Sequence, residues 1–336
     1  KLSVEVLSFD ETTQTLVPRK VVSWFDNGYK KASQWLGLKS IGNTVSPFRD
    51  VHHKGVLITR NHSIWSEGNW VHSEDAKTVT MVTLGMNKTQ KQVMYGCVLG
   101  DGTCSYSRKE DKNAYFQFGH SVKQKDYFNK KALLFSRFPH NICVRTSGYG
   151  SEVHSFRVNA CADATSLRTN GYCEGRRKVT QSYLAEVGTL GLAIWFMDDG
   201  SRIKSRDELE CHSTNKFSRV TFSAYRYTES DVREIVSWLN SFGYEASAHM
   251  TTRKGKNLGY VIQLSSKGSQ LFFKDIAPYV PVSMEYKLPL EVRGGHKVHW
   301  WDNSAPEYKT VSTPVKWKFN DRNDRDRTIT STKAYD

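Results

Sequence analysis

The sequence has 336 residues, of which 38% are hydrophobic and 12% are aromatic. A chain of this length and apolar content is expected to bury more than one core, which excludes a disordered polyelectrolyte. Lys and Arg outnumber Asp and Glu by 48 to 34, giving a formal net charge of +14. The basic residues are spread along the chain, which favours a folded surface that binds a polyanion such as nucleic acid. A solubilising surface explains any single basic run equally well.

The cysteines form no CxxC pair and no evenly spaced framework. They are Cys97, Cys104, Cys143, Cys161, Cys173 and Cys211. Because the sequence shows no signal peptide and no apolar run of about 18 residues, we expect reduced thiols in a cytoplasmic protein that is not secreted and has no membrane segment. The protein would equally reside wherever the DNA of its host gene lies. A structural zinc site is disfavoured, since such sites usually draw ligands from close pairs.

Residues 1–85 are expected to be rich in β-strands, because short β-branched and aromatic runs alternate there with polar turns. The residue pattern changes from strand-like to helix-like in MNKTQKQVMYGCVL, residues 86–99. Its polar start suits a helix cap near Asn87 or Thr89. Apolar residues follow at helical spacing, and GDGT at residues 100–103 ends the helix.

A long pattern then occurs twice, once around Asp101-Gly102 and once around Asp199-Gly200. Each copy predicts a helix, two strands, a second helix, two more strands and a final helix. Each copy also ends in a lysine, Lys178 in RRKVT and Lys287 in MEYKLP. A lone lysine is usually a solvated charge, but its recurrence at a similar distance behind each acid favours a role.

Two helices packed side by side with their carboxyl ends together would bring Asp101 and Asp199 close to each other. Neighbouring carboxylates at the negative ends of two helix dipoles are destabilised unless a cation shares them. Mg²⁺ suits such a site, because it takes a few carboxylate oxygens together with water and phosphate. The pattern therefore predicts metal-assisted phosphodiester hydrolysis, with Lys178 and Lys287 offsetting developing charge. A solvent-facing turn explains either aspartate taken alone.

MYGCVLGDGT (Met94–Thr103) and LAIWFMDDGS (Leu192–Ser201) resemble the two LAGLIDADG motifs of single-chain homing endonucleases. The resemblance covers about residues 86–290. It implies an α+β fold of two αββαββα halves, whose motif helices form the interface and whose antiparallel β-saddles lie along the DNA major groove. It also implies a monomer that cuts both strands of a long double-stranded DNA target with Mg²⁺. Mn²⁺ is expected to substitute, whereas Ca²⁺ is expected to bind without supporting cleavage.

By position in the motifs, Asp101 and Asp199 resemble the metal-binding acids, and the two lysines resemble the active-site basic residues. Two departures stand out. The small residue Gly96 of the first motif is Ile194 in the second, so the helix interface is expected to be asymmetric. Asp198 stands where the first motif has Gly100. Gly100 and Asp198 are kept as further candidate metal contacts.

Polar residues on the predicted strands are candidates for DNA contact, because alternate side chains of a strand share one face of the sheet. In the first half they are Gln117, His120, Arg145, Ser147, His154 and Arg157. In the second half they are Arg202, Lys204, Arg206, Arg219, Thr221, Ser223, Thr251 and Arg253.

The flanks resemble a Hint-type intein domain. LITRNHSIW resembles the intein block with Thr and His three residues apart, which assigns a vestigial splicing site to Thr59 and His62; a core histidine explains His62 equally well. Splicing needs a Cys or Ser at the start and an Asn at the end, and the sequence begins with Lys1 and ends with Asp336. We therefore expect the chain as given to be unable to splice.

The predicted organisation is a Hint-like segment at 1–85, a first half at 86–183, a second half at 184–290 and a Hint-like segment at 291–336. The favoured function is a site-specific homing endonuclease of intein origin. Two alternatives stay open, a maturase-like protein that binds nucleic acid without cutting and a splicing intein whose terminal residues are missing from this sequence.

Overall fold

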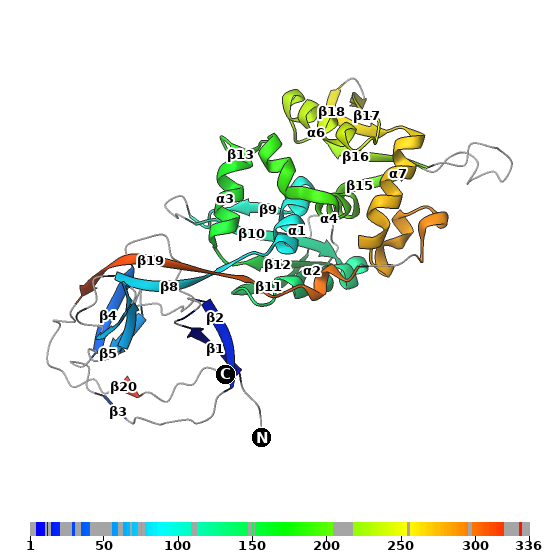
Figure 1. The fold of residues 1–336 in the computed structure, drawn as a ribbon. Helices are drawn as coiled ribbons and strands as arrows, with labels where there is room; N and C mark the ends of the chain where they lie inside the picture. The colour runs from blue at the N-terminus through cyan, green and yellow to red at the C-terminus, as the bar shows by residue number, and fades with distance from the viewer. Residues whose placement is uncertain are drawn as a thin grey trace. The chain divides into compact units, whose positions relative to one another are not determined.

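A computed structural model describes residues 5–10, 12, 15–20, 29–30, 35–40, 56–59, 63–67, 69–72, 75, 78–108, 113–146, 150, 152–203, 218–253, 256–294, 298–318 and 329–330. The chain forms two compact units (Figure 1). The first unit combines Lys1–Gly85 with Glu307–Asp336, and the second is Met86–Pro306. Each unit is described by itself below.

The first unit is built from antiparallel strands. They are β1 (Glu5–Asp10), β2 (Thr15–Lys20), β3 (Tyr29–Lys30), β4 (Trp35–Ser40), β5 (Val56–Thr59), β6 (Ser63–Ser66), β7 (Asn69–His72), β8 (Thr78–Gly85), β19 (Glu307–Lys318) and β20 (Ile329–Thr330). One sheet has the strand order β5-β4-β19-β8, and three two-stranded ribbons pair β1 with β2, β3 with β20 and β6 with β7. The predicted β-rich character of both flanks is therefore observed.

Strand β19 joins the two flanks into one sheet. It pairs with β8 from Glu307 opposite Gly85 to Pro314 opposite Thr78, and then continues along β4. The chain therefore leaves this unit at Gly85 and returns to it at the paired residue Glu307, as the neighbouring ribbons β8 and β19 show in Figure 1. The second unit extends to Pro306, beyond the boundary at residue 290 that the sequence suggested.

The first half of the second unit follows the predicted order of elements. It consists of α1 (Lys88–Leu99), β9 (Thr103–Ser105), β10 (Tyr115–Ser121), η3 (Val122–Gln124), α2 (Lys125–Leu134), β11 (His140–Thr146), β12 (Glu152–Val158) and α3 (Ala162–Asn170). The four strands form an antiparallel sheet in the order β9-β10-β12-β11.

The second half repeats this arrangement. It consists of α4 (Gln181–Asp199), β15 (Gly200–Ile203), β16 (Arg219–Ala224), α6 (Glu229–Ser241), β17 (Ala246–Arg253), β18 (Lys256–Leu264) and α7 (Ser266–Ile276). Its sheet has the order β15-β16-β18-β17, so both halves use their first, second, fourth and third strands in the same sequence. The predicted pair of αββαββα halves is confirmed. Helix α4 begins before residue 184, where the sequence analysis placed the boundary.

Short elements complete the second unit. The ribbon of β13 (Tyr172–Cys173) and β14 (Arg176–Arg177) links the halves. Beyond α7 come the 3₁₀ turns η4 (Ala277–Tyr279), η5 (Val282–Lys287), η6 (Leu290–Val292) and η7 (Trp300–Asp302). Asn87 at the start of α1 contacts this tail, because its Nδ2 donates to the carbonyl oxygens of Asn303 and Ala305 and to Asn303 Oδ1.

The motif helices have defined starts. Asn87 is the N-cap of α1 and forms a reciprocal capping box with Gln90, as the polar start of this segment predicted. Thr180 caps α4, which bends at Gly188, where a φ of 58° lies in the region that glycine tolerates best.

Each sheet buries one face beneath helices. Along β10 the side chains alternate between buried and half-buried, and the rings of Phe116, Phe118 and Phe156 pack together on the buried face. In the second half, Phe222 stacks on Trp195 of α4 at a centroid distance of 4.0 Å. The opposite face of each sheet is left open.

Within the described part of the chain, no helix is both long and apolar enough to cross a lipid bilayer. The described cysteines Cys97, Cys104, Cys143, Cys161 and Cys173 are free thiols. Cys211 lies outside the described residues.

Candidate active site

Helices α1 and α4 pack against each other at a pair of glycines. A Cβ atom added to Gly96 would lie 2.2 Å from the carbonyl oxygen of Gly191, so neither residue has room for a side chain toward its partner. The interface is asymmetric, as the difference between the motifs predicted. The small residue of α4 is Gly191, one helical turn before the fully buried Ile194.

The paired helices bring the two predicted acids together. Asp199 is the last residue of α4, and Asp101 follows the end of α1 by two residues. Partial burial, the neighbouring Asp101 carboxylate and the charge of Asp198 raise the pKa of Asp199 to about 7. Partial desolvation and the charge of Asp198 also raise the pKa of Asp101, while a hydrogen bond with Asp199 lowers it. Two neighbouring carboxyl groups of this kind repel each other when both are ionised. A bound cation would reduce that repulsion.

A basic residue closes the end of each motif helix. Lys287 Nζ donates to the carbonyl oxygens of Phe196 (3.2 Å), Met197 (2.5 Å) and Gly200 (3.0 Å) at the end of α4. At the end of α1, Arg177 donates to the carbonyl oxygens of Gly100 and Gly102, both at 2.6 Å. Cations are favourable at these positions, because the carbonyls carry the negative end of each helix dipole.

This geometry changes the pairing of basic residues that the sequence suggested. Lys287 lies at the site, but its counterpart in the first half is Arg177 rather than Lys178. The Lys178 side chain is exposed, because alternation along the chain past β14 turns it away from the end of α1. Arg177, and not Lys178, therefore occupies the position at the end of α1 that corresponds to Lys287 at the end of α4.

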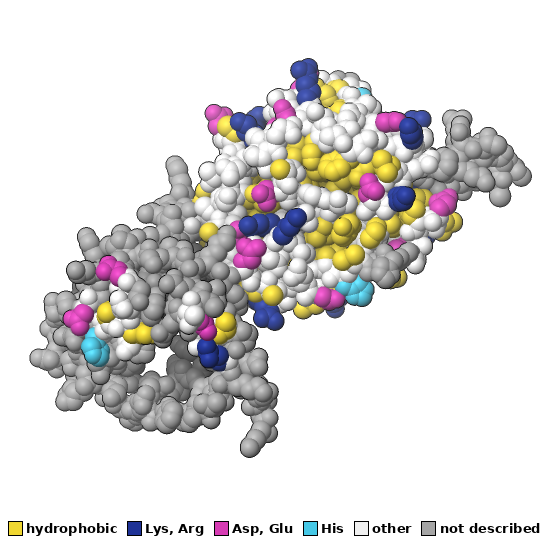
Figure 2. All heavy atoms as spheres, in the orientation of Figure 1, with side chains coloured by type: hydrophobic (Ala, Val, Ile, Leu, Met, Phe, Trp, Pro, Cys, Tyr) yellow, Lys and Arg dark blue, Asp and Glu magenta, His cyan; other side chains and the backbone are white. Residues whose placement is uncertain are grey.

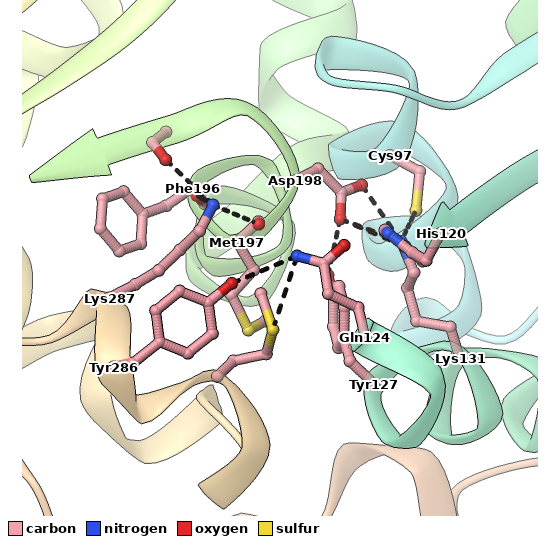
Figure 3. A network of polar contacts seen from close by, with 12 residues as sticks. Cys97, His120, Gln124, Tyr127, Lys131, Phe196, Met197, Asp198, Tyr286 and Lys287 are labelled. Carbon is pink, nitrogen blue, oxygen red and sulfur yellow. Dashed lines mark hydrogen bonds and ion pairs between the residues drawn. The ribbon is translucent and has the colours of Figure 1, made fainter. Parts of the chain in front are cut away.

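The Asp198 carboxylate points toward Lys131 and Tyr127 of the first half (Figure 3). Its carboxylate accepts hydrogen bonds from Lys131 Nζ at 3.0 and 3.1 Å and from the Tyr127 hydroxyl at 2.8 Å. Its side chain is fully buried. The Gly100 carbonyl, in turn, accepts from Arg177. The structure thus engages both of the additional candidate metal contacts, Asp198 and Gly100, in protein contacts.

The donor set suits a hard cation that shares its coordination with a substrate. Among the residues that the structure describes, no group of three His, Cys, Asp or Glu side chains gathers into a metal site made of protein ligands alone. Two carboxylates with raised pKa values supply oxygen ligands without completing a coordination shell, which leaves positions for water and phosphate. The residues present therefore fit a divalent cation such as Mg²⁺ when it is held together with a nucleic-acid backbone.

Asp101 lies at the edge of the open face of the first sheet. Asp101, Thr103, Gln117 and Arg145 line one hollow of about 550 Å³. Gln117 Nε2 and Arg145 Nη2 both donate to Ser155 Oγ, at 3.0 and 2.9 Å. On the same face, the Arg157 guanidinium lies 3.6 Å from the centre of the Tyr115 ring. Donors for base edges and phosphates therefore lead directly to the acid pair.

Two predicted DNA contacts of the first half lie on the wrong face. His120 and His154 pair across β10 and β12 on the buried side, where their rings contact Tyr127 and Phe128 of α2. Burial and the charge of Lys131 hold the pKa of His120 well below its usual value, so this ring is neutral. The prediction failed because both histidines sit one residue out of phase with the open face. Ser147 lies outside the described residues.

In the second sheet, some of the predicted DNA-contact residues lie on the open face and others do not. Arg219, Thr221 and Ser223 alternate onto its open face, where Ser201 Oγ lies 2.7 Å from Thr221 Oγ1. Thr251 shares this face and donates to the Gly259 carbonyl at 2.9 Å. Arg202 was predicted there but belongs to the opposite face, where its Nη1 donates to Ser218 Oγ at 2.8 Å.

Three further candidates of the second half are not placed by their side chains. Lys204 and Arg206 lie outside the described residues, and Arg253 belongs to β17 with only its backbone described. Of the suggested splicing pair, Thr59 ends β5 with its backbone opposite Trp35, whereas His62 lies outside the described residues.

Several residues of the open faces were missed. They are Thr103, Asn141 and Ser155 in the first sheet and Ser201, Ser247, His249 and Gln263 in the second. Counting alternate residues from Gln117 or Thr221 through the strand pairings would have found them. On the face drawn in Figure 2, Lys and Arg side chains of the second unit stand singly or in pairs.

Comparisons with known proteins agree with this architecture. The profile of the LAGLIDADG DNA endonuclease family matches residues 91–272. Protein RecA of Mycolicibacterium flavescens is 31% identical over 303 residues, which cover 88% of this chain and 68% of that protein. A probable intron-encoded endonuclease of Wickerhamomyces canadensis is 23% identical over 217 residues, 62% of this chain and 87% of that protein.

The fold is also that of a solved structure. The homing endonuclease I-WcaI bound to its DNA recognition sequence superposes with a TM-score of 0.50 and 19% sequence identity, covering 61% of this chain and 88% of that chain. The family profile spans both motif helices and both open sheets. The chain therefore belongs to the LAGLIDADG DNA endonuclease family.

Proposed function

We propose that this DNA endonuclease cuts both strands of a specific double-stranded site at the Asp101 and Asp199 carboxylates, with Mg²⁺ as its metal. The observation that carries the proposal is the convergence of these two acids between the ends of α1 and α4. Their pKa values are raised because desolvation and the neighbouring carboxylates outweigh the effect of the nearby basic residues, which favours a bound cation at this pair. Because both halves are in one chain, the protein acts as a monomer on two strands.

Asp101 and Asp199 would hold the cation, which when bound supplies a Lewis acid for the phosphodiester and a more acidic water. The acids also fix where the scissile phosphates lie relative to the two sheets. Arg177 and Lys287 keep the helix ends closed and place positive charge behind the acid pair, where it offsets the charge of the approaching backbone.

The open sheet faces are the proposed DNA-binding surface. Gln117, Arg145 and Arg157 in the first half offer amide and guanidinium donors, which suit adenine, guanine and phosphate. Arg219 and the hydroxyls of Thr221 and Ser223 offer the equivalent surface in the second half. The +14 net charge supplies a further attraction that is independent of sequence.

The test is cleavage of a supercoiled plasmid library in Mg²⁺, with the ends of the products sequenced. We expect one long target with short staggered ends, cut by the wild-type protein and by Asp302→Asn, which changes an exposed acid elsewhere. Asp101→Asn and Asp199→Asn should bind the target without cutting it. Undiminished cutting by both of these variants would refute the assignment of the acids.

The metal is tested in the same assay. Mn²⁺ should substitute for Mg²⁺, whereas Ca²⁺ should support binding without hydrolysis, because its larger and more flexible coordination holds the reacting oxygens less well. Cleavage in Ca²⁺ alone would contradict this expectation. Tight binding with no cleavage in Mg²⁺ or Mn²⁺ would favour a maturase-like protein that keeps the fold without cutting.

We also propose that the endonuclease is the insert of an intein whose splicing domain is the first unit. The pairing of Gly85 with Glu307 supports this origin, since it lets the whole second unit leave and re-enter one sheet at neighbouring residues. The similarity to mycobacterial RecA proteins supports it as well, because these relatives contain the stretch that aligns with both endonuclease motifs. Intact mass measurement of the mature host protein tests the proposal, and persistence of residues 1–336 within that protein would contradict it.

A further inference from the structure

The ends of the two motif helices are not equivalent. The residue before the metal-binding acid is Asp198 in α4 and Gly100 in α1. A Cβ atom at Gly100 would lie only 2.9 Å from Cβ of Asp198 and 3.4 Å from Cδ1 of Trp195. Only one of the two positions can therefore carry a side chain, and Cβ of Asp198 takes that space.

This carboxylate connects the second half to the first. Lys131 of α2 donates to Asp198 and lies 3.4 Å from Sγ of Cys97, and both charged side chains are fully buried. Although burial alone would lower it, the pKa of Lys131 is raised by the charge of Asp198 and by Cys97, so the lysine stays protonated. The neutral His120 ring also lies beside this pair, with its Nε2 3.7 Å from Asp198 Oδ1.

The second half has no such pair within its described residues. The buried positions of α2 and α6 follow the same spacing, with Tyr127, Phe128, Lys131 and Leu134 matching Asp231, Val232, Ile235 and Trp238. By this spacing the counterpart of Lys131 is Ile235, which is fully buried. The end of α4 thus takes part in a buried ion pair, whereas the corresponding positions for the end of α1 are Gly100 and Ile235.

We propose that Asp198 and Lys131 form a latch that holds the end of α4 against the first half and makes the two strand-cleavage steps unequal. Asp198 is then a positioning residue, because it acts through the backbone of the adjacent Asp199 rather than on the DNA. Lys287 fixes the same helix end to its own half. Losing the latch would leave Asp199 placed correctly for the strand held by the second half but not for the other strand. This inference rests on the proposed function.

The experiment measures the nicking rate of each strand, using a target duplex labelled differently on its two strands. The main variant is the double substitution Asp198→Asn with Lys131→Met, which removes both charges together and so leaves no uncompensated buried ion. Lys130→Met is the matched control, since its exposed ion pair with Asp126 lies on the same helix. DNA affinity is measured in Ca²⁺ for each protein.

We expect the double variant to bind like the wild type and to change the ratio of the two strand rates about tenfold, since small misplacements of reacting groups cost up to about 100-fold. Duplex nicked in one strand should accumulate, whereas Lys130→Met should cut like the wild type. A wild-type ratio in a double variant that folds and binds would overturn the latch. Failure of the wild-type protein itself to cut would refute the proposed function, and the latch with it.

A milder variant keeps the test decisive should the double variant fail to fold. Tyr127→Phe removes only the hydroxyl that donates to Asp198 at 2.8 Å. We expect a smaller change of the strand ratio in the same direction, with the same strand slowed. An equal slowing of both strands would instead indicate a general loss of stability and overturn the proposal.

Discussion

A Cβ atom on Gly96 would lie 2.2 Å from the carbonyl oxygen of Gly191 and 2.7 Å from its Cα. The backbones of α1 and α4 therefore touch where the two halves meet. This contact lies about one turn before the end of α1 and about two turns before the end of α4, so it sets the separation of the helix ends and with it that of Asp101 and Asp199. A single backbone contact thus governs both the interface and the candidate metal site.

The first prediction follows from this contact. Gly96→Ala forces the two backbones apart, because the obstructing atoms belong to the main chain and cannot change rotamer. We expect the second unit to lose about 3 kcal/mol or more in its free energy of unfolding, at the upper end of overpacking costs. Denaturant unfolding measures the loss, with the exposed position Lys88→Ala as the control. An unchanged midpoint for Gly96→Ala would contradict the close packing.

Much of this fold could be predicted from the sequence, because the helix and strand periods and the glycines after Asp101 and Asp199 are local signals. The repeated order of elements then indicated that Asp101 and Asp199 occupy equivalent positions in the two halves. The small partner of Gly96 could not be predicted in the same way. Alignment of the motifs places Ile194 opposite Gly96, whereas the packing uses Gly191, which follows the bend at Gly188 by three residues.

The candidate site shows a second limit. The network around Asp198 depends on Lys131, which lies 67 residues away in the chain, and no local pattern distinguishes this buried lysine from the half-buried Lys130. Likewise, Gln117 and His120 lie three residues apart on β10 and therefore on opposite faces, but which of the two faces is covered depends on the packing of α2 against the sheet. Residues whose roles depend on tertiary contacts were therefore the ones that sequence analysis misassigned.

The second prediction concerns the cations at the helix ends. Arg177→Met and Lys287→Met each remove a charged donor from two or more carbonyl groups. We expect each to cost about 2 kcal/mol of stability, since hydrogen bonds to charged groups contribute about 1.5–3 kcal/mol. Thermal unfolding measures the cost. Cleavage should slow in both variants, because the positive charge behind the acids is lost.

Lys178→Met is the matched control for this prediction. Its side chain is exposed, so its stability should change by no more than about 0.5 kcal/mol. A larger effect at Lys178 than at Arg177 on either stability or cleavage would restore the pairing that the sequence alone suggested.

The third prediction separates the open sheet face from the rest of the surface. Arg145 lines the hollow beside Asp101, whereas Arg233 pairs with Glu229 on the outer surface of α6. Arg145→Ala should weaken DNA binding, and a phosphate contact would reduce the slope of log affinity against log salt by about 1. Arg233→Ala should leave both quantities unchanged. Fluorescence anisotropy in Ca²⁺ at several salt concentrations measures them, and equal effects of the two variants would exclude this face as the binding surface.

The fourth prediction follows from the acid pair in the absence of metal. Burial and the charges of Asp101 and Asp198 raise the pKa of Asp199 from its ordinary value of 3.8 to about 7. The folded protein therefore holds a proton that the unfolded chain releases, so stability falls as the pH rises from about 4 to 7 and stays reduced above that range.

Asp199→Asn removes this cost. In EDTA at pH 8 the variant should be more stable than the wild type by about 1–2 kcal/mol, a value reduced from the full shift because solvent screens a site that is open on one side. At pH 4 the two proteins should unfold alike, since the wild-type carboxyl is then protonated in the folded state. Added Mg²⁺ should stabilise the wild type at pH 8 and leave the variant unchanged, because a cation bound to the folded state alone shifts the equilibrium toward it. Thermal unfolding with and without Mg²⁺ at both pH values measures these differences. A variant less stable than the wild type in EDTA at pH 8 would show that Asp199 is a structural residue and not a metal ligand whose charge destabilises the metal-free fold.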